Sequence, residues 1–195
     1  MYIQYDNINN YTLKEYQIFY NSLTKNDKLR IDKIVNKNKQ KQFILSRIIL
    51  KNILKDKYNI NYQDVIIKYN KYDKPTIDNI YFNISHSHDY VIVATSNKEI
   101  GIDIEKIRKV NLNIAKRFCT DNEYAYILNS NNKYYHFWQI YTLKEAYFKM
   151  IGQDLANIKN IEFSINDKIT IKNHPNINII SSNEINDYII AIIYK

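Results

Sequence analysis

Two carboxylates stand in the stretch GIDIE at residues 101–105, which has the alternating pattern of a β-strand. Because alternate strand residues point to opposite faces, the isoleucines face a core while Asp103 and Glu105 share the other face. Two neighbouring carboxylates repel each other, and a hard divalent cation held by oxygen ligands would relieve that repulsion. The pair therefore predicts a Mg²⁺ site, although a solvated strand face shows the same pattern.

A predicted helix at residues 133–150 carries a third acid. Glu145 and Lys149 are four residues apart and so share one face of that helix. Glu145 is a candidate third metal ligand, and Lys149 is a candidate partner of a phosphate group. An ordinary Glu–Lys pair on a wet helix, worth about 0.3–0.5 kcal/mol, explains the same spacing.

Residues 83–88 have the sequence NISHSH and form a predicted polar turn at the end of the strand predicted at 80–84. Ser85 and His86 are candidate hydrogen-bond donors to phosphate oxygens. His86 and His88 also have the alternate spacing of a transition-metal pair on a strand. A plain polar turn is the third interpretation, and the sequence leaves all three open.

Basic residues are abundant: the formal net charge is +8 and the pI is about 9.2. One basic run contains Lys25, Lys28, Arg30 and Lys33, and the next helix carries Arg47 and Lys51. Such a patch is a candidate phosphate contact, although basic runs are more often solvated faces. A positive surface attracts nucleic acid, membranes, phosphorylated cofactors and acidic proteins alike, so charge alone does not choose among them.

The elements that must position these residues form two similar series. Between Gln40 and Lys55 the apolar face includes Leu45 and Ile49, and Arg47 falls on the opposite side. Helical patterns cover 24–57, 111–129 and 133–150, and strand patterns cover 65–69, 80–84, 90–95, 100–104, 161–165, 168–172, 177–181 and 188–194.

Helix followed by strands thus occurs twice along the chain, with a change near residues 96–99. We predict an α+β fold with an N-terminal α+β half at 1–99 and a C-terminal α+β half at 100–195. Clefts between such halves commonly hold ligands, so we expect the site there.

Three motifs, taken in order, resemble the signature of the 4′-phosphopantetheinyl transferase superfamily, in particular its surfactin-synthetase-activating type. They are FNISHS at 82–87, IGIDIE at 100–105 and YTLKEAYFK at 141–149. The resemblance implies a pseudo-two-fold monomer of two similar α+β halves. It also implies an enzyme that moves the phosphopantetheine arm of coenzyme A to a serine of an apo carrier protein. Such an enzyme depends on Mg²⁺, with Mn²⁺ as an alternative, and releases adenosine 3′,5′-bisphosphate.

The resemblance also assigns roles to individual residues. Asp103, Glu105 and Glu145 match the metal ligands, and Glu145 is the candidate general base for the attacking serine. Lys149 matches a pyrophosphate contact and Ser85 and His86 match cofactor phosphate contacts, while Lys74 and Pro75 match a loop near the adenine.

Two positions depart from the family pattern. The family usually has tryptophan at Tyr141, and we expect the tyrosine to keep its packing role. The family usually has a basic residue near Gln42 for the 3′-phosphate of coenzyme A. Because glutamine is neutral, we expect one of four nearby basic residues to replace it: Lys28, Arg30, Lys41 or Arg47.

The expected partners are coenzyme A and an acidic, helical apo carrier protein of the peptidyl or acyl type, with no nucleic acid and no membrane. Cys119 is the only cysteine, which excludes an internal disulfide and a cysteine-rich zinc site. No signal-peptide pattern and no apolar run of about 20 residues is present, so we expect a cytoplasmic protein. Two other functions remain in view: a metal-dependent phosphohydrolase and a basic, tyrosine-rich nucleic-acid-binding module.

Overall fold

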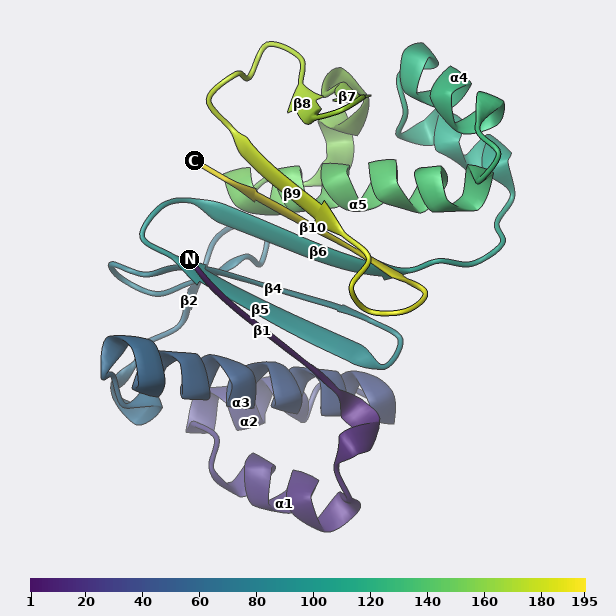
Figure 1. The fold of residues 1–195 in the computed structure, drawn as a ribbon. Helices are drawn as coiled ribbons and strands as arrows, with labels where there is room; N and C mark the ends of the chain where they lie inside the picture. Colours follow the sequence, from purple (N-terminus) through teal and green to yellow (C-terminus); the bar gives the residue numbers. More distant parts are fainter.

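The computed structural model describes residues 1–195, arranged as four layers in the order helix, sheet, sheet, helix (Figure 1). Both main sheets are antiparallel and three-stranded, with strand orders β1-β5-β4 and β6-β10-β9. The strands are β1 (Tyr2–Asn7), β4 (Tyr81–Ser87), β5 (Tyr90–Ser96), β6 (Ile100–Lys106), β9 (Asn178–Ser182) and β10 (Tyr188–Tyr194). The helices are α1 (Leu13–Asn21), α2 (Lys25–Ile31), α3 (Lys37–Tyr58), α4 (Asp121–Asn129) and α5 (Lys133–Ile151).

Shorter elements complete the chain. They are the paired strands β2 (Lys68–Tyr69) and β3 (Pro75–Thr76), the paired strands β7 (Phe163–Ile165) and β8 (Ile169–Ile171), and 3₁₀ turns at Ile8–Asn10, Tyr62–Asp64, Leu112–Arg117 and Leu155–Asn160. No helix is both long enough and apolar enough to cross a membrane.

The two halves repeat one topology, which confirms the predicted α+β fold. Each half runs strand, long helix, then two strands: β1, α3, β4, β5 in the first and β6, α5, β9, β10 in the second. In each sheet the strand that comes last in the sequence lies in the centre, between the two earlier strands of that half. The first sheet ends in sequence at Ser96 and the second begins at Ile100.

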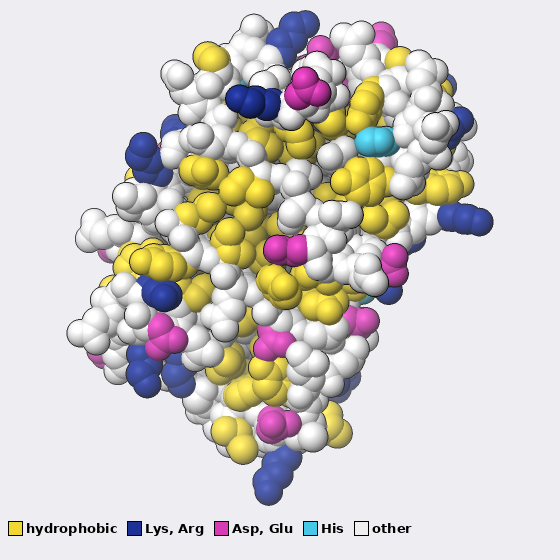
Figure 2. Space-filling model, in the orientation of Figure 1, with side chains coloured by type: hydrophobic (Ala, Val, Ile, Leu, Met, Phe, Trp, Pro, Cys, Tyr) yellow, Lys and Arg dark blue, Asp and Glu magenta, His cyan; other side chains and the backbone are white.

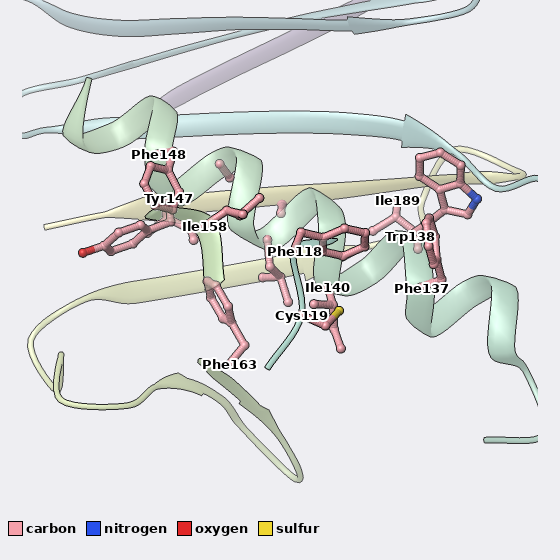
Figure 3. Packing of buried hydrophobic residues seen from close by; sticks show 14 of the residues in the cluster. Phe118, Cys119, Phe137, Trp138, Ile140, Tyr147, Phe148, Ile158, Phe163 and Ile189 are labelled. Atoms are coloured by element: carbon pink, nitrogen blue, oxygen red, sulfur yellow. The ribbon is translucent and has the colours of Figure 1, made fainter. Parts of the chain in front are cut away.

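Three apolar clusters hold the layers together. The first packs α3 on its sheet, as Leu45 does near Val91, and the second packs α5 on the other sheet through residues such as Leu143. Figure 3 shows the second cluster, whose aromatic side chains line α5 and also arrive from neighbouring segments. The third cluster lies between the sheets and includes Ile102 and Ile104, as the strand alternation predicts. Each isoleucine so buried stabilises the fold by about 1.5–3 kcal/mol.

Side chains, rather than backbone pairs, join the two sheets where β4 meets β6. Alternate polar residues of β4 accept hydrogen bonds from alternate backbone amides of β6, which would otherwise be buried without partners. The three bonds run from Ile102 N to Asn83 Oδ1 (3.1 Å), from Ile104 N to Ser85 Oγ (3.4 Å) and from Lys106 N to Ser87 Oγ (3.2 Å). We call these three contacts the seam.

The outer edges of the two sheets differ from the seam. Strand β1 forms one edge and leaves Tyr2, Ile3 and Tyr5 exposed, and β9 forms another edge with Ile180 exposed. Figure 2 shows hydrophobic side chains in a band across this face of the molecule, with Lys and Arg side chains toward its periphery.

The sequence-based elements need several corrections. The predicted helix at 24–57 is two helices, because Asn36 caps a new start for α3. Strand β1 and helix α1 were not predicted, and the strand predicted at 65–69 is reduced to β2. The helical pattern at 111–129 contains a 3₁₀ turn before α4. Arg47, predicted on the solvent side of its helix, is only 3% exposed.

Candidate active site

Asp103 is the centre of a polar cluster beneath α5. It lies in the middle of β6 and is only 3% exposed. Its Oδ1 accepts one hydrogen bond from Ser85 Oγ and another from Lys149 Nζ, both at 2.6 Å. Lys149 Nζ also donates to Ser85 Oγ at 2.9 Å. The other carboxylate oxygen, Oδ2, is buried without any hydrogen-bond partner, and such an acceptor favours a cation or donor beside it.

A glycine allows α5 to approach this cluster. A Cβ on Gly101 would lie 1.9 Å from Ala146 O and 2.4 Å from Met150 N, so no larger residue fits there without displacing the helix. Glu145 and Lys149 belong to the same stretch of α5. The close approach of helix and strand therefore brings their side chains to the carboxylates of β6.

Glu105 lies two residues beyond Asp103 on the same face of β6. Its Oε2 accepts a hydrogen bond from Ser87 Oγ at 2.8 Å, and Arg108 Nη1 lies 3.8 Å away. Burial and the charge of Asp103 together raise the pKa of Glu105 to about 7. The charge of Asp103 thus disfavours the charged form of Glu105, as the sequence pattern predicts.

Glu145 approaches the polar cluster from α5. Its Oε1 accepts a hydrogen bond from the hydroxyl of Tyr141 at 2.8 Å. Burial, followed by the charge of Asp103, raises the pKa of Glu145 above its usual value. Tyr141 packs edge-on against Phe118 and Trp138, with ring centroids 5.1 and 5.8 Å apart, which confirms its predicted packing role. Its hydrogen bond to Glu145 was not predicted.

These residues fit a hard cation by their chemistry. The donors are oxygens only, the Oδ2 atom of Asp103 lacks a partner, and a cation would offset the causes that raise the pKa of Glu105 and Glu145. However, no three His, Cys, Asp or Glu side chains of the structure converge closely enough to form a metal site. The assignment of Asp103, Glu105 and Glu145 as metal ligands therefore stays a prediction, and His86 with His88 gains no third ligand.

A basic pocket of about 570 Å³ opens beside the cluster. Asp73 is the single acid that lines it. A smaller pocket of about 220 Å³ shares Asp73, Pro75 and Ile84 with it and reaches Lys149. The two pockets thus adjoin each other, and the smaller one reaches Lys149 of the Asp103 cluster; we call the two pockets together the groove. The basic side chains of the larger pocket are Arg30, Lys33, Lys39, Arg47 and His86.

Ser85 and His86, predicted as a pair of phosphate contacts, point to opposite sides of β4. Ser85 faces Asp103, whereas His86 lines the basic pocket. Loss of hydration, followed by the positive charges of Lys149 and Lys39, lowers the pKa of His86. The neutral imidazole is therefore favoured, and it offers one hydrogen-bond donor rather than a charge.

Lys74 and Pro75 lie at the boundary between the two halves. Lys74 Nζ donates to Met150 O near the end of α5 at 2.8 Å, and burial lowers the pKa of Lys74. Pro75 lines both the basic pocket and the smaller one. The predicted loop is thus at the groove, with its lysine tied to the C-terminal half.

The four candidates for the missing basic contact separate clearly. Arg30 and Arg47 line the basic pocket. Lys28 does not: its Nζ donates to Asn21 O at 3.0 Å. Lys41 lies over the ring of Tyr16 and lines another pocket. Gln42, at the family's usual basic position, donates to His88 O at 2.7 Å and so supports the turn after β4.

Several residues of the site were missed by sequence reasoning. Lys39 lines the basic pocket beside Lys33 of the predicted basic run, and Ser87 and Tyr141 each donate a hydrogen bond to one of the two glutamates. The alternate spacing of polar residues in NISHSH at 83–88 was the available signal for Ser87, since it places residues 83, 85 and 87 on one face.

Comparison with known proteins supports the resemblance found in the sequence. The family description "4′-phosphopantetheinyl transferase superfamily" matches residues 99–193, and "4′-phosphopantetheinyl transferase, N-terminal" matches residues 10–98. The two matches together cover nearly the whole chain. This chain belongs to the 4′-phosphopantetheinyl transferase superfamily.

Individual relatives agree with that membership. The 4′-phosphopantetheinyl transferase gsp of Aneurinibacillus migulanus is 34% identical over 62% of this chain and 57% of its own length. The 4′-phosphopantetheinyl transferase ffp of Bacillus subtilis is 33% identical over 69% of this chain and 62% of its own length. The 4′-phosphopantetheinyl transferase Sfp of Bacillus subtilis is 33% identical over 58% of this chain and 53% of its own length. The chain thus spans somewhat more than half the length of these relatives.

A solved structure, the holo-[acyl-carrier-protein] synthase of Thermotoga maritima, matches at a TM-score of 0.43 and 21% identity. The match covers 49% of this chain and 61% of that one. That likeness is too weak to support an argument. Neither alternative function, phosphohydrolase or nucleic-acid-binding module, finds support among the relatives, which are named as transferases.

Proposed function

We propose that this protein transfers the 4′-phosphopantetheine arm of coenzyme A to a serine of an apo carrier protein. One observation carries the proposal: a buried Asp103–Lys149–Ser85 cluster stands at the end of a groove that begins in a basic pocket. Coenzyme A is a long molecule with a phosphorylated adenosine end and a central pyrophosphate. A basic pocket followed by a lysine beside carboxylates is complementary to that order of groups.

In the proposed reaction the carrier serine oxygen forms a bond to the β-phosphorus of coenzyme A. The bond between that phosphorus and the bridging pyrophosphate oxygen breaks, and adenosine 3′,5′-bisphosphate leaves with that oxygen. The serine proton is transferred to a carboxylate, for which Glu145 is the candidate. Lys149 donates to pyrophosphate oxygens and stabilises the negative charge that builds on the leaving group.

Asp103, Glu105 and Glu145 would hold Mg²⁺, with Mn²⁺ as an alternative. When bound, the ion supplies positive charge to the pyrophosphate oxygens. Ser87 and Tyr141 orient the two glutamates through hydrogen bonds of 2.8 Å each. The seam therefore serves the proposed site as well as the fold, because Ser85 and Ser87 belong to both.

The carrier is proposed to be acidic and helical, because a chain of net charge +8 attracts an acidic partner over long range. The stretch from Lys144 to Ile161, next to the cluster, is the proposed contact. A monomer in the cytoplasm is the proposed working form. Peptidyl carriers of peptide synthetases and acyl carriers are both candidate substrates.

Intact-mass spectrometry of apo carriers, after incubation with the protein, coenzyme A and Mg²⁺, tests the function. A mass gain of one phosphopantetheine is expected on at least one carrier. The variants Asp103→Asn and Glu105→Gln are expected to lower the initial rate by about 10²–10³-fold, because each removes charge from the reacting centre. Glu184→Gln, an equal charge change on an exposed loop, is the control and should keep the wild-type rate.

Two outcomes would reject the proposal. Release of adenosine 3′,5′-bisphosphate at the same rate with and without carrier would indicate a phosphohydrolase. Normal transfer by folded Asp103→Asn and Glu105→Gln variants would show that these carboxylates are not part of the reacting site.

A further inference from the structure

The basic pocket contains one acid whose charge is already paired with the pocket's own arginine. Arg30 Nη2 donates to both carboxylate oxygens of Asp73, at 2.8 and 2.9 Å. Arg30 stands on α2 and Asp73 stands in the loop between β2 and β3, forty-three residues further along the chain. Both line the pocket. Arginine binds carboxylate and phosphate with the same planar array of donors, so Asp73 occupies donors that would suit a phosphate.

Arg30 is held in place by contacts other than Asp73. Its guanidinium stacks on the ring of Tyr69, 3.8 Å from the centroid. The hydroxyl of Tyr69 in turn accepts a hydrogen bond from Arg47 Nη2 at 2.9 Å. Because Arg47 is buried against Asp27, the stacked ring is fixed from the core. Arg30 therefore keeps its position when its anionic partner changes.

The loop of Asp73 is likewise anchored without its carboxylate. Asn70 Nδ2 donates to Gly152 O at 2.9 Å, and Lys74 Nζ donates to Met150 O at 2.8 Å. Asp73 itself has φ +60°, a left-handed conformation that aspartate and asparagine tolerate better than most residues. Its side chain is 73% exposed, whereas that of Arg30 is 37% exposed. An exposed ion pair is weak, so its partner can be exchanged at small cost.

We propose that Asp73 is a resident competitor for phosphate: it pairs with Arg30 in the empty pocket and gives up those donors to a phosphate group of the incoming nucleotide. The loop between β2 and β3 stays in place during this exchange. The identity of the anion, a 3′-phosphorylated adenosine, rests on the proposed function, whereas the competition rests on the Arg30–Asp73 geometry. The pocket consequently binds the nucleotide less tightly than it would without Asp73, and this lower affinity favours release of the bisphosphate product.

The opposite role for Asp73 would be to orient Arg30 for the ligand. The two roles predict opposite signs. A competitor lowers affinity, so its removal tightens binding, while an orienting residue raises affinity, so its removal weakens binding.

Isothermal titration calorimetry with adenosine 3′,5′-bisphosphate, without carrier or metal, measures this sign. Asp73→Asn keeps the shape and the left-handed backbone but removes the charge. It is expected to lower the dissociation constant about two- to fivefold, the range of an exposed ion pair. Arg30→Gln is expected to raise that constant.

Asp78→Asn is the matched control. Asp78 pairs with Lys68 at 2.8 Å, its side chain is 75% exposed, and it follows β3 outside the basic pocket. The same charge change there should leave the dissociation constant unchanged. In the Arg30→Gln background, Asp73→Asn should lose most of its effect, because the competition acts through Arg30.

Weaker binding by Asp73→Asn, an equal gain with and without Arg30, or an equal gain from Asp78→Asn would each overturn the proposal. Failure of adenosine 3′,5′-bisphosphate to bind the wild-type protein would overturn it too. The transfer assay tests the proposed function separately. If the nucleotide affinities follow the expected pattern but no transfer occurs, the proposed function is rejected and the competition stands. Transfer with affinities that do not change would reject the competition alone.

Discussion

In each half of the molecule, one buried ion pair attaches the long helix to the short helix before it. In the N-terminal half Arg47 of α3 pairs with Asp27 of α2 at 3.0 Å, and both side chains are 4% exposed. In the C-terminal half Lys144 of α5 pairs with Glu123 of α4 at 2.7 Å, with 0% and 1% exposed. The long helix of each half is thus tied to the short helix before it.

The two acids also occupy equivalent positions in sequence. Asp27 follows the N-cap Thr24 by three residues, and Glu123 follows the N-cap Thr120 by three. Each acid accepts from its threonine, through the hydroxyl of Thr24 or the backbone N–H of Thr120. The same Thr-x-x-acid cap occurs at Thr12 and Glu15 of α1, so what the two halves share is not the motif itself but the burial of the capping acid against a cation of the long helix.

The two ion pairs differ in their surroundings, because one borders the basic pocket and the other is enclosed in the core. Arg47 donates to Tyr69 and borders the basic pocket, so its pair supports a binding surface. Lys144 instead donates to Ile158 O and Ile161 O and is sealed inside the C-terminal half. The N-terminal half therefore contributes positive charge to the groove, and the C-terminal half contributes most of the carboxylates.

The largest effect is expected from Lys144→Met. Removing one partner of a buried pair leaves Glu123 charged in the core, so the free energy of unfolding should fall by about 3–5 kcal/mol. Urea unfolding measures this loss. Lys133→Met, at the exposed start of the same helix, is the control. An unchanged unfolding midpoint for Lys144→Met would mean that the pair does not stabilise the half.

The thiol of Cys119 supplies a second readout for that variant. It is 2% exposed within the cluster beneath α5, and burial raises its pKa to about 12. In the native protein near neutral pH the thiol is protonated and shielded, so alkylation should be slow. Faster alkylation in Lys144→Met would place the loss in the C-terminal half.

Arg47→Met should be nearly as destabilising, by about 3 kcal/mol, since Asp27 would keep the hydroxyls of Tyr62 and Thr24 as donors. Unlike Lys144→Met, it should also weaken binding of adenosine 3′,5′-bisphosphate, because Tyr69 loses its support. Urea unfolding and calorimetry together separate the two effects. Equal nucleotide affinity in folded Arg47→Met and wild-type protein would contradict the binding role.

Gly101→Ala should cost about 1–3 kcal/mol, because the added methyl group displaces α5 from β6. It should also slow transfer, since Glu145 and Lys149 move with the helix. The counterpart strand β1 is an exposed edge, so Gln4→Ala should change the free energy of unfolding by less than about 0.5 kcal/mol. Thermal unfolding compares the two, and equal losses would refute the tight contact.

Ser87→Ala should have the smallest effect on stability, about 1 kcal/mol, through the hydrogen bonds lost by Lys106 N and Glu105. Its effect on Mn²⁺ affinity, measured by electron paramagnetic resonance, should be a decrease, because Glu105 loses its orientation. Ser164→Ala, on the exposed side of β7, is the control and should leave both quantities unchanged.

Much of the fold follows from local pattern. The alternation around Asp103 correctly predicts which residues of β6 enter the core between the sheets, and the helical pattern predicts α5 almost to its ends. The edge strand β1 was missed because its exposed tyrosines and polar residues lack the contrast between a buried and a wet face. Helix α1 was missed for a similar reason, since only Tyr16 of it is buried.

The candidate site was predicted in part. Asp103 and Lys149 do meet, at 2.6 Å, whereas Asp103, Glu105 and Glu145 do not converge as a set of three metal ligands. Lys28 was assigned to the site on charge alone, and the structure places it elsewhere. A run of charged residues does not predict where each side chain points, because a long basic side chain can lie on either side of its helix end.

By itself the sequence determined which residues share a face: Asp103 with Glu105, and Glu145 with Lys149. Those relations depend only on the periods of strand and helix. The tertiary structure decided which faces meet. Lys144 and Lys149 are five residues apart, which is about 140° around a helix, and packing buried one against Glu123 while turning the other to Asp103. No local period contains that choice, because it depends on where α4, β6 and β4 come to lie against α5.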